Sequence, residues 1–179
     1  MENKMELTLK NGEILTFRKL NISDYDNVNK FLERIATESP NTNQYVGQPP
    51  KNYADCEKIY ASEQYLFLGV FNATNELVGS CSIGINKPNH PYMGLNSSFG
   101  ISVLKAYYGC GIGSVFMDEM EKWAREKKMH RIQGEVRAEN RRAISLYIKH
   151  GFSIEGCAKE TAWINGKWMD SYYIGKILK

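Results

Sequence analysis

Short apolar runs recur along this chain with two different spacings, and the spacing of each run predicts a strand or a helix. Alternating or continuous apolar runs bounded by turn residues are typical of strands. They predict strands over residues 14–19, 65–71, 77–85, 95–103 and 131–136. Two more strands are expected after Phe152, joined at Asn165-Gly166, a dipeptide that favours tight two-residue hairpins.

Apolar residues three or four positions apart predict the helices, because that spacing lines up one face of an α-helix. One helix should follow Ser23, its expected N-cap, and another should lie within residues 53–63. The apolar faces of the first helix and of two later ones are Val28, Phe31, Leu32, Ile35; Val115, Phe116, Met120, Trp123, Ala124; and Ala143, Ile144, Tyr147, Ile148. Gly151 should end the last helix. The order β-α-α-β-β-β-α-β-α-β-β predicts a mixed α/β protein.

The segment 108–114, YGCGIGS, places glycines at alternate positions directly before a predicted helix. Such a turn can aim several backbone N–H groups at one point, where the positive end of the helix dipole also lies, so it suits a phosphate group. A P-loop would need a Lys-Ser/Thr pair after the last glycine, and a dinucleotide fingerprint would need glycine at Ser114. A plain tight turn without a ligand would show the same glycines, so the glycines alone leave both interpretations open.

Composition describes an ordinary soluble protein and predicts one domain over residues 1–179, with 42% hydrophobic and 24% charged residues. The net charge of +3 gives no argument for nucleic acid, and the chain shows neither a transmembrane stretch nor a signal-peptide pattern. We therefore expect a cytoplasmic protein that binds neither nucleic acid nor membranes. The cysteines form no CxxC pair and the histidines have no metal-ligand spacing, which predicts free thiols and no metal: Cys56, Cys81, Cys110, Cys157, His90, His130 and His150.

The glycine turn and a later segment, NRRAISLYIKHGF, together resemble the GNAT acyltransferase family. The family turn reads Gln/Arg-x-x-Gly-x-Gly/Ala, and residues 108–113 here read YGCGIG. The later family pattern is matched by Asn140, Ala143, Leu146-Tyr147 and Gly151-Phe152. The resemblance covers roughly residues 65–177, and the C-terminal part resembles the branch that holds ribosomal-protein and small-amine N-acetyltransferases.

The resemblance implies a GNAT fold, with a mostly antiparallel twisted sheet that splays between the strands at 95–103 and 131–136, and about four flanking helices. It implies acetyl-CoA as co-substrate, without a metal. The pantetheine arm would pair with the backbone after Gly100, and the pyrophosphate would bind the amides of the glycine turn. The implied cofactor-binding residues are Ile101, Ser102, Val103, Tyr108, Gly109, Cys110, Gly111, Ile112, Gly113, Ser114, Asn140, Ala143 and Tyr147. Tyr108 replaces the family's Gln/Arg, which predicts weaker cofactor affinity.

The implied reaction is the attack of a primary amine on a thioester. An alkylammonium group has a pKa of about 10.4, so a general base is useful at neutral pH. Glu135 matches the catalytic glutamate of the ribosomal-protein enzymes, and Glu38 or water are alternative bases. Glu135 would equally fit as a charged residue near a strand end that takes no part in the chemistry. By resemblance, the N–H of Val103 would stabilise the oxyanion and Tyr147 would protonate or hydrogen-bond the leaving thiolate. Tyr147 on an apolar helical face would also suit the core.

We therefore expect an acetyl-CoA-dependent N-acetyltransferase that works by direct attack in a ternary complex, without an acyl-enzyme on Cys110. The alternatives are a non-catalytic acyl-CoA-binding module and an acyltransferase that uses a longer acyl donor. The acceptor is a small-molecule amine or a protein N-terminus, and dimers are common in the family, so a homodimer fits the resemblance. Acceptor selectivity should lie in the loops 39–52 and 86–94 and in the final hairpin, where Tyr45, Tyr92, Trp163 and Trp168 occur.

Overall fold

The computed structural model describes residues 4–179 and contains, in that range, four α-helices, two short 3-10 helices and eight strands. The strands are β1 (Met5–Thr8), β2 (Ile14–Lys19), β3 (Tyr65–Phe71), β4 (Leu77–Ile85), β5 (Asn96–Val103), β6 (Arg131–Arg137), β7 (Ser153–Ile164) and β8 (Lys167–Ile177). The helices are η1 (Ile22–Asp24), α1 (Tyr25–Glu38), α2 (Tyr53–Tyr60), η2 (Lys105–Tyr107), α3 (Ile112–Glu126) and α4 (Arg141–Lys149). The mixed α/β prediction is confirmed.

The strands are hydrogen-bonded in the order β1-β2-β3-β4-β5-β6-β8-β7. Strands β5 and β6 run parallel, whereas the pairs β1–β2, β2–β3, β6–β8 and β7–β8 are antiparallel. The parallel register covers only Asn96, Ser97 and Ser98 opposite residues 131–133, although β5 continues to Val103. The pairing thus stops partway along both strands, in agreement with the splay expected there.

The chain divides into two compact units, and the division passes through β4, β5 and α3. The first unit comprises Met1–Ile83 and Ile101–Phe116, and the second comprises Gly84–Gly100 and Met117–Lys179. Across residues 4–179, no helix is both long and apolar enough to span a membrane.

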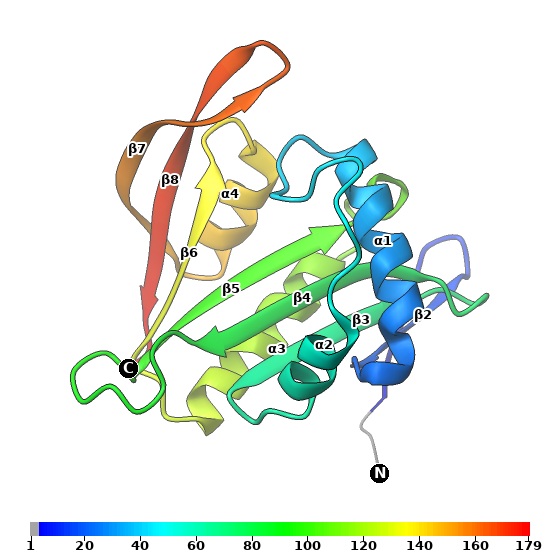
Figure 1. The fold of residues 1–179 in the computed structure, drawn as a ribbon, viewed down its shortest axis with the longest axis horizontal. Coiled ribbons are helices and arrows are strands. Elements are labelled where there is room, and N and C mark those ends of the chain that lie inside the picture. Colours follow the sequence, from blue (N-terminus) through cyan, green and yellow to red (C-terminus); the bar gives the residue numbers. More distant parts are fainter. Residues whose placement is uncertain (1–3) are drawn as a thin grey trace. The chain divides into compact units, whose positions relative to one another are not determined.

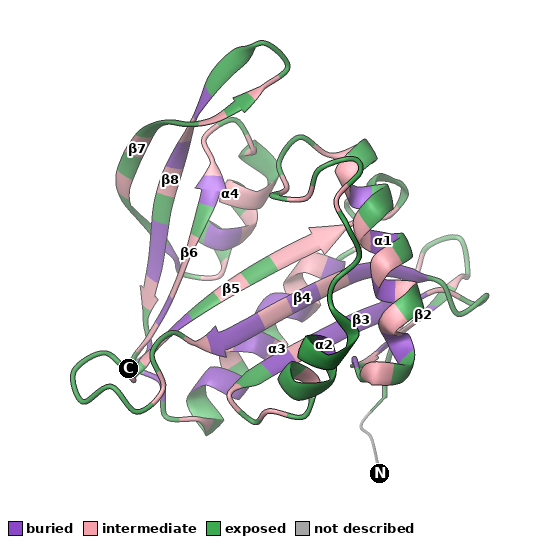
Figure 2. Ribbon diagram, viewed as in Figure 1, coloured by how far each residue is buried: buried purple, intermediate pink, exposed green. Residues whose placement is uncertain are grey.

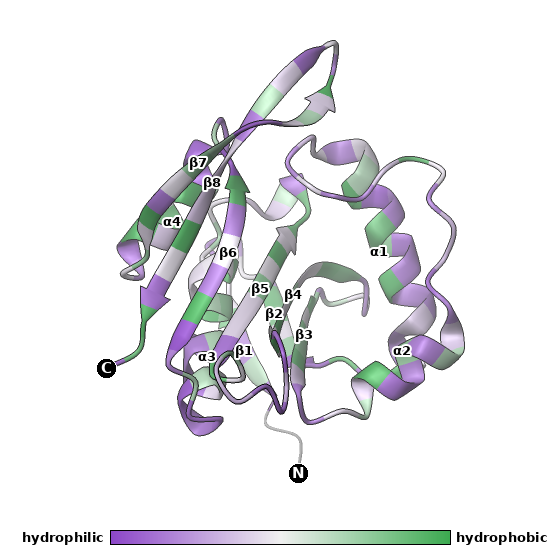
Figure 3. Ribbon diagram, turned by 60° about the vertical axis from the view of Figure 1, so that its left-hand side comes forward, coloured by the Kyte–Doolittle hydropathy of each residue, from purple (hydrophilic) through white to green (hydrophobic). Residues whose placement is uncertain are grey.

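The first unit is built on the buried strands β2, β3 and β4, beside which α1 and α2 lie (Figure 1). Alternate residues of β2 are buried, with Leu15 and Phe17 at 0% and 2% exposure, as period-two patterning predicts. Phe17 packs edge-on against Phe116 at a ring separation of 5.5 Å. The amphipathic banding of α1 is visible in Figure 3, and its buried residues are Val28, Phe31 and Ile35. Burial of these faces, shown in Figure 2, provides the unit's apolar core.

The second unit is built on β6, β8 and β7, with α4 beside them (Figure 1). Strand β8 pairs with β6 along the whole of β6, from Arg131 opposite Ile177 to Arg137 opposite Ser171. The β7–β8 hairpin closes at Asn165 and Gly166, whose φ angles of 50° and 80° are those of a tight type I′ turn. This turn was predicted correctly.

Three local expectations are wrong. Strand β1 was not predicted, because it is a short edge strand with mostly exposed residues and therefore lacks an apolar signature. Ser23 is not the N-cap of α1, since Asn21 caps the preceding turn of 3-10 helix and α1 follows Asp24. Ile148 is 56% exposed and lies off the buried face of α4.

Candidate functional site

The glycine turn in the first unit has a backbone that requires glycine at two positions. Gly109 and Gly111 have φ angles of 78° and 86°, in the left-handed region that other residues rarely adopt. A Cβ at either position would meet nothing within 4 Å, so backbone conformation, not crowding, sets the requirement. Gly113 already lies within α3, so its role is not to make the turn.

The turn passes directly into the N-terminus of α3. The amides of Ser114 and Val115 both donate to the carbonyl of Gly111, at 3.0 and 3.2 Å. Gly111 therefore supplies the acceptor for the first hydrogen bonds of the helix. The first turn of α3 is made of uncharged residues, and the helix is 15 residues long. Its leading N–H groups and its dipole together favour an anion at this end.

The end of β5 in the first unit carries the predicted residues Ile101, Ser102 and Val103, all half-buried. A Cβ on Gly79 of β4 would lie 3.4 Å from the carbonyl oxygen of Ser102 and from a methyl group of Val103, so the two strands approach closely there. Leu104, which follows, donates its amide to the carbonyl of Val78 at 2.9 Å. This segment therefore lies close against β4 and is hydrogen-bonded to it.

In the second unit, Asn140 is the N-cap of α4. Its side-chain oxygen accepts a hydrogen bond from the amide of Ala143 at 3.2 Å. The cap satisfies one of the N–H groups that lack a partner within the helix. Gly151 ends the same helix with a φ of 81°, as predicted.

Tyr147 of α4 is 8% exposed and packs in an aromatic cluster. Its ring meets Phe99 edge-on at 5.3 Å and lies 6.1 Å from the ring of Phe152. Burial raises the pKa of Tyr147 to about 12, because the apolar surroundings disfavour the phenolate. The phenol is therefore a neutral hydrogen-bond donor at any physiological pH.

Glu135 lies on β6 with a side chain that is 46% exposed. Arg137, two residues later on the same strand face, donates to Glu135 at 3.3 Å and to the hydroxyl of Ser171 at 2.7 Å. The same nitrogen lies 3.3 Å from the hydroxyl of Thr161, which itself lies 2.7 Å from that of Ser171. Arg137 thus joins an accessible carboxylate to two hydroxyl groups of β7 and β8.

Arg137 was missed as a functional candidate, although a signal existed. Opposite charges two residues apart on a strand share a face and can pair. Its partner Thr161 depends on the irregular register between Ala158 and Ala162 in the β7–β8 pair, which local sequence does not reveal. Its partner Ser171 lies directly opposite it in the β6–β8 pair.

Glu38, the alternative base, is hydrogen-bonded to backbone. One carboxylate oxygen accepts from the amide of Lys105 at 2.9 Å, and the other lies 3.4 Å from a guanidinium nitrogen of Arg34. Glu38 is thus joined to the segment that leads into the glycine turn.

The aromatic residues expected near the acceptor are exposed: Tyr45, Tyr92, Trp163 and Trp168. The two tryptophans contact each other at the tip of the β7–β8 hairpin, with ring centroids 5.2 Å apart. Tyr92 instead contacts His90 within its own loop.

All four cysteines, which fall in the described range, are free thiols, as predicted. Cys110 is half-buried in the glycine turn, with its sulfur 3.9 Å from the carbonyl of Tyr108. Within residues 4–179, the His, Cys, Asp and Glu side chains form no group of three or more that could hold a metal ion.

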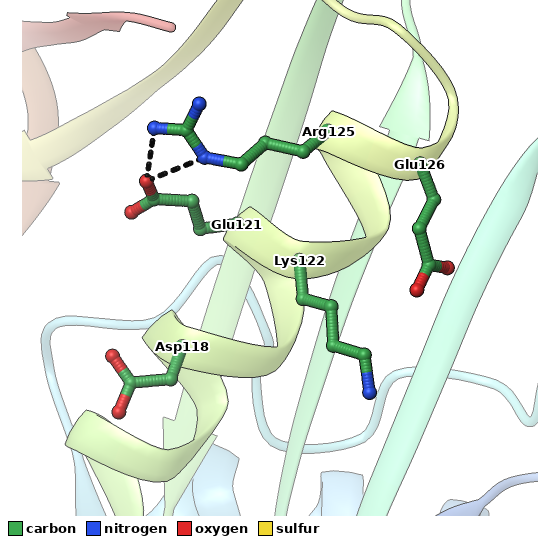
Figure 4. A pocket seen from close by; sticks show the side chains of 5 residues that line it. All are labelled: Asp118, Glu121, Lys122, Arg125 and Glu126. Carbon is green, nitrogen blue, oxygen red and sulfur yellow. Dashed lines mark hydrogen bonds and ion pairs between the residues drawn. The ribbon is translucent and has the colours of Figure 1, made fainter.

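A charged hollow lies on α3 in the second unit, and Figure 4 shows its lining residues Asp118, Glu121, Lys122, Arg125 and Glu126. Arg125 donates to Glu121 at 2.7 Å, one helical turn away. Lys176 of β8 pairs with the same carboxylate at 2.5 Å. Burial would raise the pKa of Glu121, but these two cations outweigh it and lower the pKa. The hollow is thus an ion-paired helix face.

Comparison with known proteins gives three related results. A family model described as "Acetyltransferase (GNAT) family" matches residues 30–152. The L-amino acid N-acetyltransferase AaaT of Escherichia coli (strain K12) is 33% identical over 107 residues. The match covers 57% of this chain and 62% of AaaT, so it spans less than two thirds of that relative.

Solved structures share the fold. An acetyltransferase of the GNAT family from Streptococcus pneumoniae has a TM-score of 0.83 at 26% identity, covering 92% of this chain and 99% of that one. A phosphinothricin acetyltransferase from Sinorhizobium meliloti, solved in complex with AcCoA, has a TM-score of 0.77 at 16% identity, covering 92% and 88%. The predicted GNAT fold is confirmed, and the chain belongs to the GNAT acetyltransferase family.

Proposed function

We propose that the protein transfers the acetyl group of acetyl-CoA to a primary amine. The observation that supports this most strongly is the glycine turn, where two left-handed glycines lead into the N-terminus of α3. Membership of the GNAT family supports the same function.

The turn suits the pyrophosphate of coenzyme A. It presents backbone N–H groups and a helix N-terminus whose first turn is uncharged. Gly109 and Gly111 have no side chain that would keep a phosphate from the backbone. The Sinorhizobium relative with the same fold binds AcCoA. We expect residues 108–114 to bind the pyrophosphate and the backbone of Ile101, Ser102 and Val103 to pair with the pantetheine arm. Asn140 and Ala143 would contact the same arm.

Acetyl-CoA supplies an activated thioester, and the protein's part is to manage protons and charge. Glu135 is exposed and hydrogen-bonded by Arg137, so it is available to accept a proton from the incoming ammonium group, directly or through water. The N–H of Val103 would donate to the developing oxyanion. The amine would attack directly in a ternary complex, because Cys110 has no neighbouring base in the turn to activate it.

Tyr147 suits the leaving thiolate as a hydrogen-bond donor. With its pKa raised to about 12, full proton transfer to a thiolate of ordinary thiol pKa, about 8.5, would be uphill by roughly 5 kcal/mol. Donation without transfer has no such cost. We therefore assign Tyr147 the stabilisation of the thiolate, which takes its final proton from solvent or receives the proton that the attacking nitrogen must lose to become the amide.

For the acceptor we propose a small amine of the amino-acid type, with a protein N-terminus as the second candidate. The first rests on the curated relative, an L-amino acid N-acetyltransferase. We also propose that the protein acts in the cytoplasm, since its four free thiols suit a reducing compartment.

An acceptor panel tests this proposal. The purified protein is mixed with acetyl-CoA and with amino acids, their decarboxylated amines, polyamines or short peptides, and thiol release is followed. Direct transfer predicts intersecting initial-velocity lines when both substrates are varied, whereas an acyl-enzyme would give parallel lines. Tight binding of acetyl-CoA without turnover of any amine would favour a non-catalytic binding module. Competition by longer acyl-CoA esters would reveal a different donor.

A further inference from the structure

Helix η2, which leads into the glycine turn, is held at both ends by side chains of the first unit. At its start, the amide of Lys105 donates to a carboxylate oxygen of Glu38 at 2.9 Å. At its end, the hydroxyl of Tyr107 lies 3.1 Å from a carboxylate oxygen of Glu13 and 3.5 Å from the side-chain nitrogen of Asn72. The position of the turn therefore depends on these partners.

The two ends of η2 are connected to each other through side chains. Glu38 pairs with Arg34 at 3.4 Å, and Arg34 also pairs with Glu76 of the β3–β4 turn. The second carboxylate oxygen of Glu76 accepts from Asn72 at 3.0 Å, and Asn72 reaches Tyr107. These contacts form a continuous network of hydrogen bonds and ion pairs, which runs from Lys105 through Glu38, Arg34, Glu76 and Asn72 to Tyr107.

Glu38 also occupies the last position of α1, directly before the loop 39–52. The amide of Ser39, the first residue of this loop, still donates to the carbonyl of Ile35. Its far end returns to the start of α1, where the amide of Lys51 donates to Asn29 at 3.2 Å and the hydroxyl of Tyr25 donates to the carbonyl of Lys51. Figure 1 shows this loop running back along α1. Contacts with α1 therefore set the path of the loop. Glu38, which directly precedes the loop, connects it to η2.

We propose that Glu38 is a positioning residue that sets the glycine turn for the cofactor phosphates and couples the turn to the loop 39–52. The inference rests on the proposed function of that turn as a phosphate site. One carboxylate oxygen of Glu38 accepts a backbone amide and the other faces a guanidinium, an arrangement that fixes geometry and leaves the carboxylate poorly placed to take a proton from substrate. Cofactor bound at the turn restricts the motion of η2. The hydrogen bond from Lys105 to Glu38 then restricts the motion of the loop 39–52 as well.

Two substitutions separate positioning from catalysis. Glu38→Gln keeps an oxygen that can accept from the Lys105 amide, so kcat should stay within about threefold of wild type. Glu38→Ala removes the acceptor, so the Kd for acetyl-CoA measured by calorimetry should rise about tenfold. Glu33→Ala, an exposed glutamate on the same helix, is the matched control and should change neither.

Hydrogen exchange gives a readout that a merely structural role would not move. In wild type, coenzyme A should slow amide exchange both in residues 105–115 and in the loop 39–52. In Glu38→Ala, saturating coenzyme A should slow exchange in 105–115 alone. A fall in kcat of about 100-fold in Glu38→Gln with unchanged Kd would identify Glu38 as the base and overturn the proposal. Unchanged Kd and unchanged loop protection in Glu38→Ala would overturn it too. Failure of the wild type to bind acetyl-CoA would instead refute the proposed function.

Discussion

The ring of Tyr147 meets the ring of Phe99 edge-on at 5.3 Å, with the two ring planes 79° apart. This contact fixes the tyrosine ring in the interior of the second unit, and burial there keeps the hydroxyl protonated. The packing role of Tyr147 and the catalytic role proposed for it are therefore compatible, since the ring is anchored by its neighbours and the hydroxyl is a neutral donor.

Replacing Tyr147 with phenylalanine should separate these two roles. Phenylalanine keeps the contacts with Phe99 and Phe152, so the fold and the affinity for acetyl-CoA should change little. Loss of a hydrogen bond to a developing thiolate should lower kcat about 10- to 100-fold. Steady-state kinetics with Tyr65→Phe, at a partly exposed tyrosine of β3, as control, measures the effect. An unchanged kcat would remove Tyr147 from the mechanism.

The raised pKa of Tyr147 also predicts a loss of stability in alkali. The unfolded chain would lose the phenolic proton near pH 10 and the folded chain only near pH 12, so stability is unaffected below pH 10 and falls between pH 10 and 12. The contribution is at most about 2–3 kcal/mol. Denaturant unfolding at pH 9 and pH 11 should therefore show a smaller loss for Tyr147→Phe than for wild type. Equal losses in the two proteins would contradict the burial of this hydroxyl.

The glycine turn can be tested against a matched glycine. Gly111 and Gly12 have φ angles of 86° and 84°, and a Cβ at either would meet nothing within 4 Å. Alanine at either position should cost a similar amount of stability, about 1 kcal/mol or more, because both backbones are left-handed. Only Gly111→Ala should weaken acetyl-CoA binding, and Gly111→Asp, which adds a negative charge, should abolish it. Normal binding by a folded Gly111→Asp variant would contradict a phosphate site here.

The two asparagine caps form a second matched pair. Asn140 accepts from Ala143 at 3.2 Å at the start of α4, and Asn52 accepts from Asp55 at 3.1 Å at the start of α2. Alanine at either cap should lower the free energy of unfolding by about 1 kcal/mol. If Asn140 also binds the cofactor arm, Asn140→Ala alone should raise the KM for acetyl-CoA. Equal KM values in the two variants would leave Asn140 as a cap only.

The proposed role of Glu135 as general base can be tested by replacing the carboxylate with the corresponding amide. Glu135→Gln preserves size and an acceptor for Arg137 but cannot take a proton, so kcat should fall about 100-fold or more with little change in acetyl-CoA affinity. The control Glu126→Gln, on the outer face of α3, should behave as wild type. A kcat for Glu135→Gln near that of the control would show that Glu135 is not the base and would point to water instead.

Much of the fold could be predicted because its signals are local. The apolar run at 65–71, the hairpin dipeptide Asn165-Gly166 and the glycine at 151 each fix structure through a few adjacent residues. The errors arose where local signals compete or are weak. Asn21 and Ser23 are both good caps two residues apart, and β1 has no buried face to give it an apolar period.

The residue types of the proposed site could be singled out from the sequence, but their contacts could not. The glycines, Asn140 and Tyr147 follow a recognisable spacing. The pairing of Glu38 with the amide of Lys105 joins positions 67 residues apart, and that of Arg137 with Ser171 depends on strand register. Such contacts follow from the assembled sheet, so they emerge only with the structure.

Transfer of an isotopically labelled acetyl group from acetyl-CoA to an amine is the decisive test of the proposed activity. The protein is incubated with labelled acetyl-CoA and an amino acid, and mass spectrometry follows the amine while thiol release is counted. A labelled N-acetyl product should form in equal amount to the released thiol, and it should form much more slowly with Tyr147→Phe. Saturable binding of acetyl-CoA with no labelled product from any amine in the panel would contradict it.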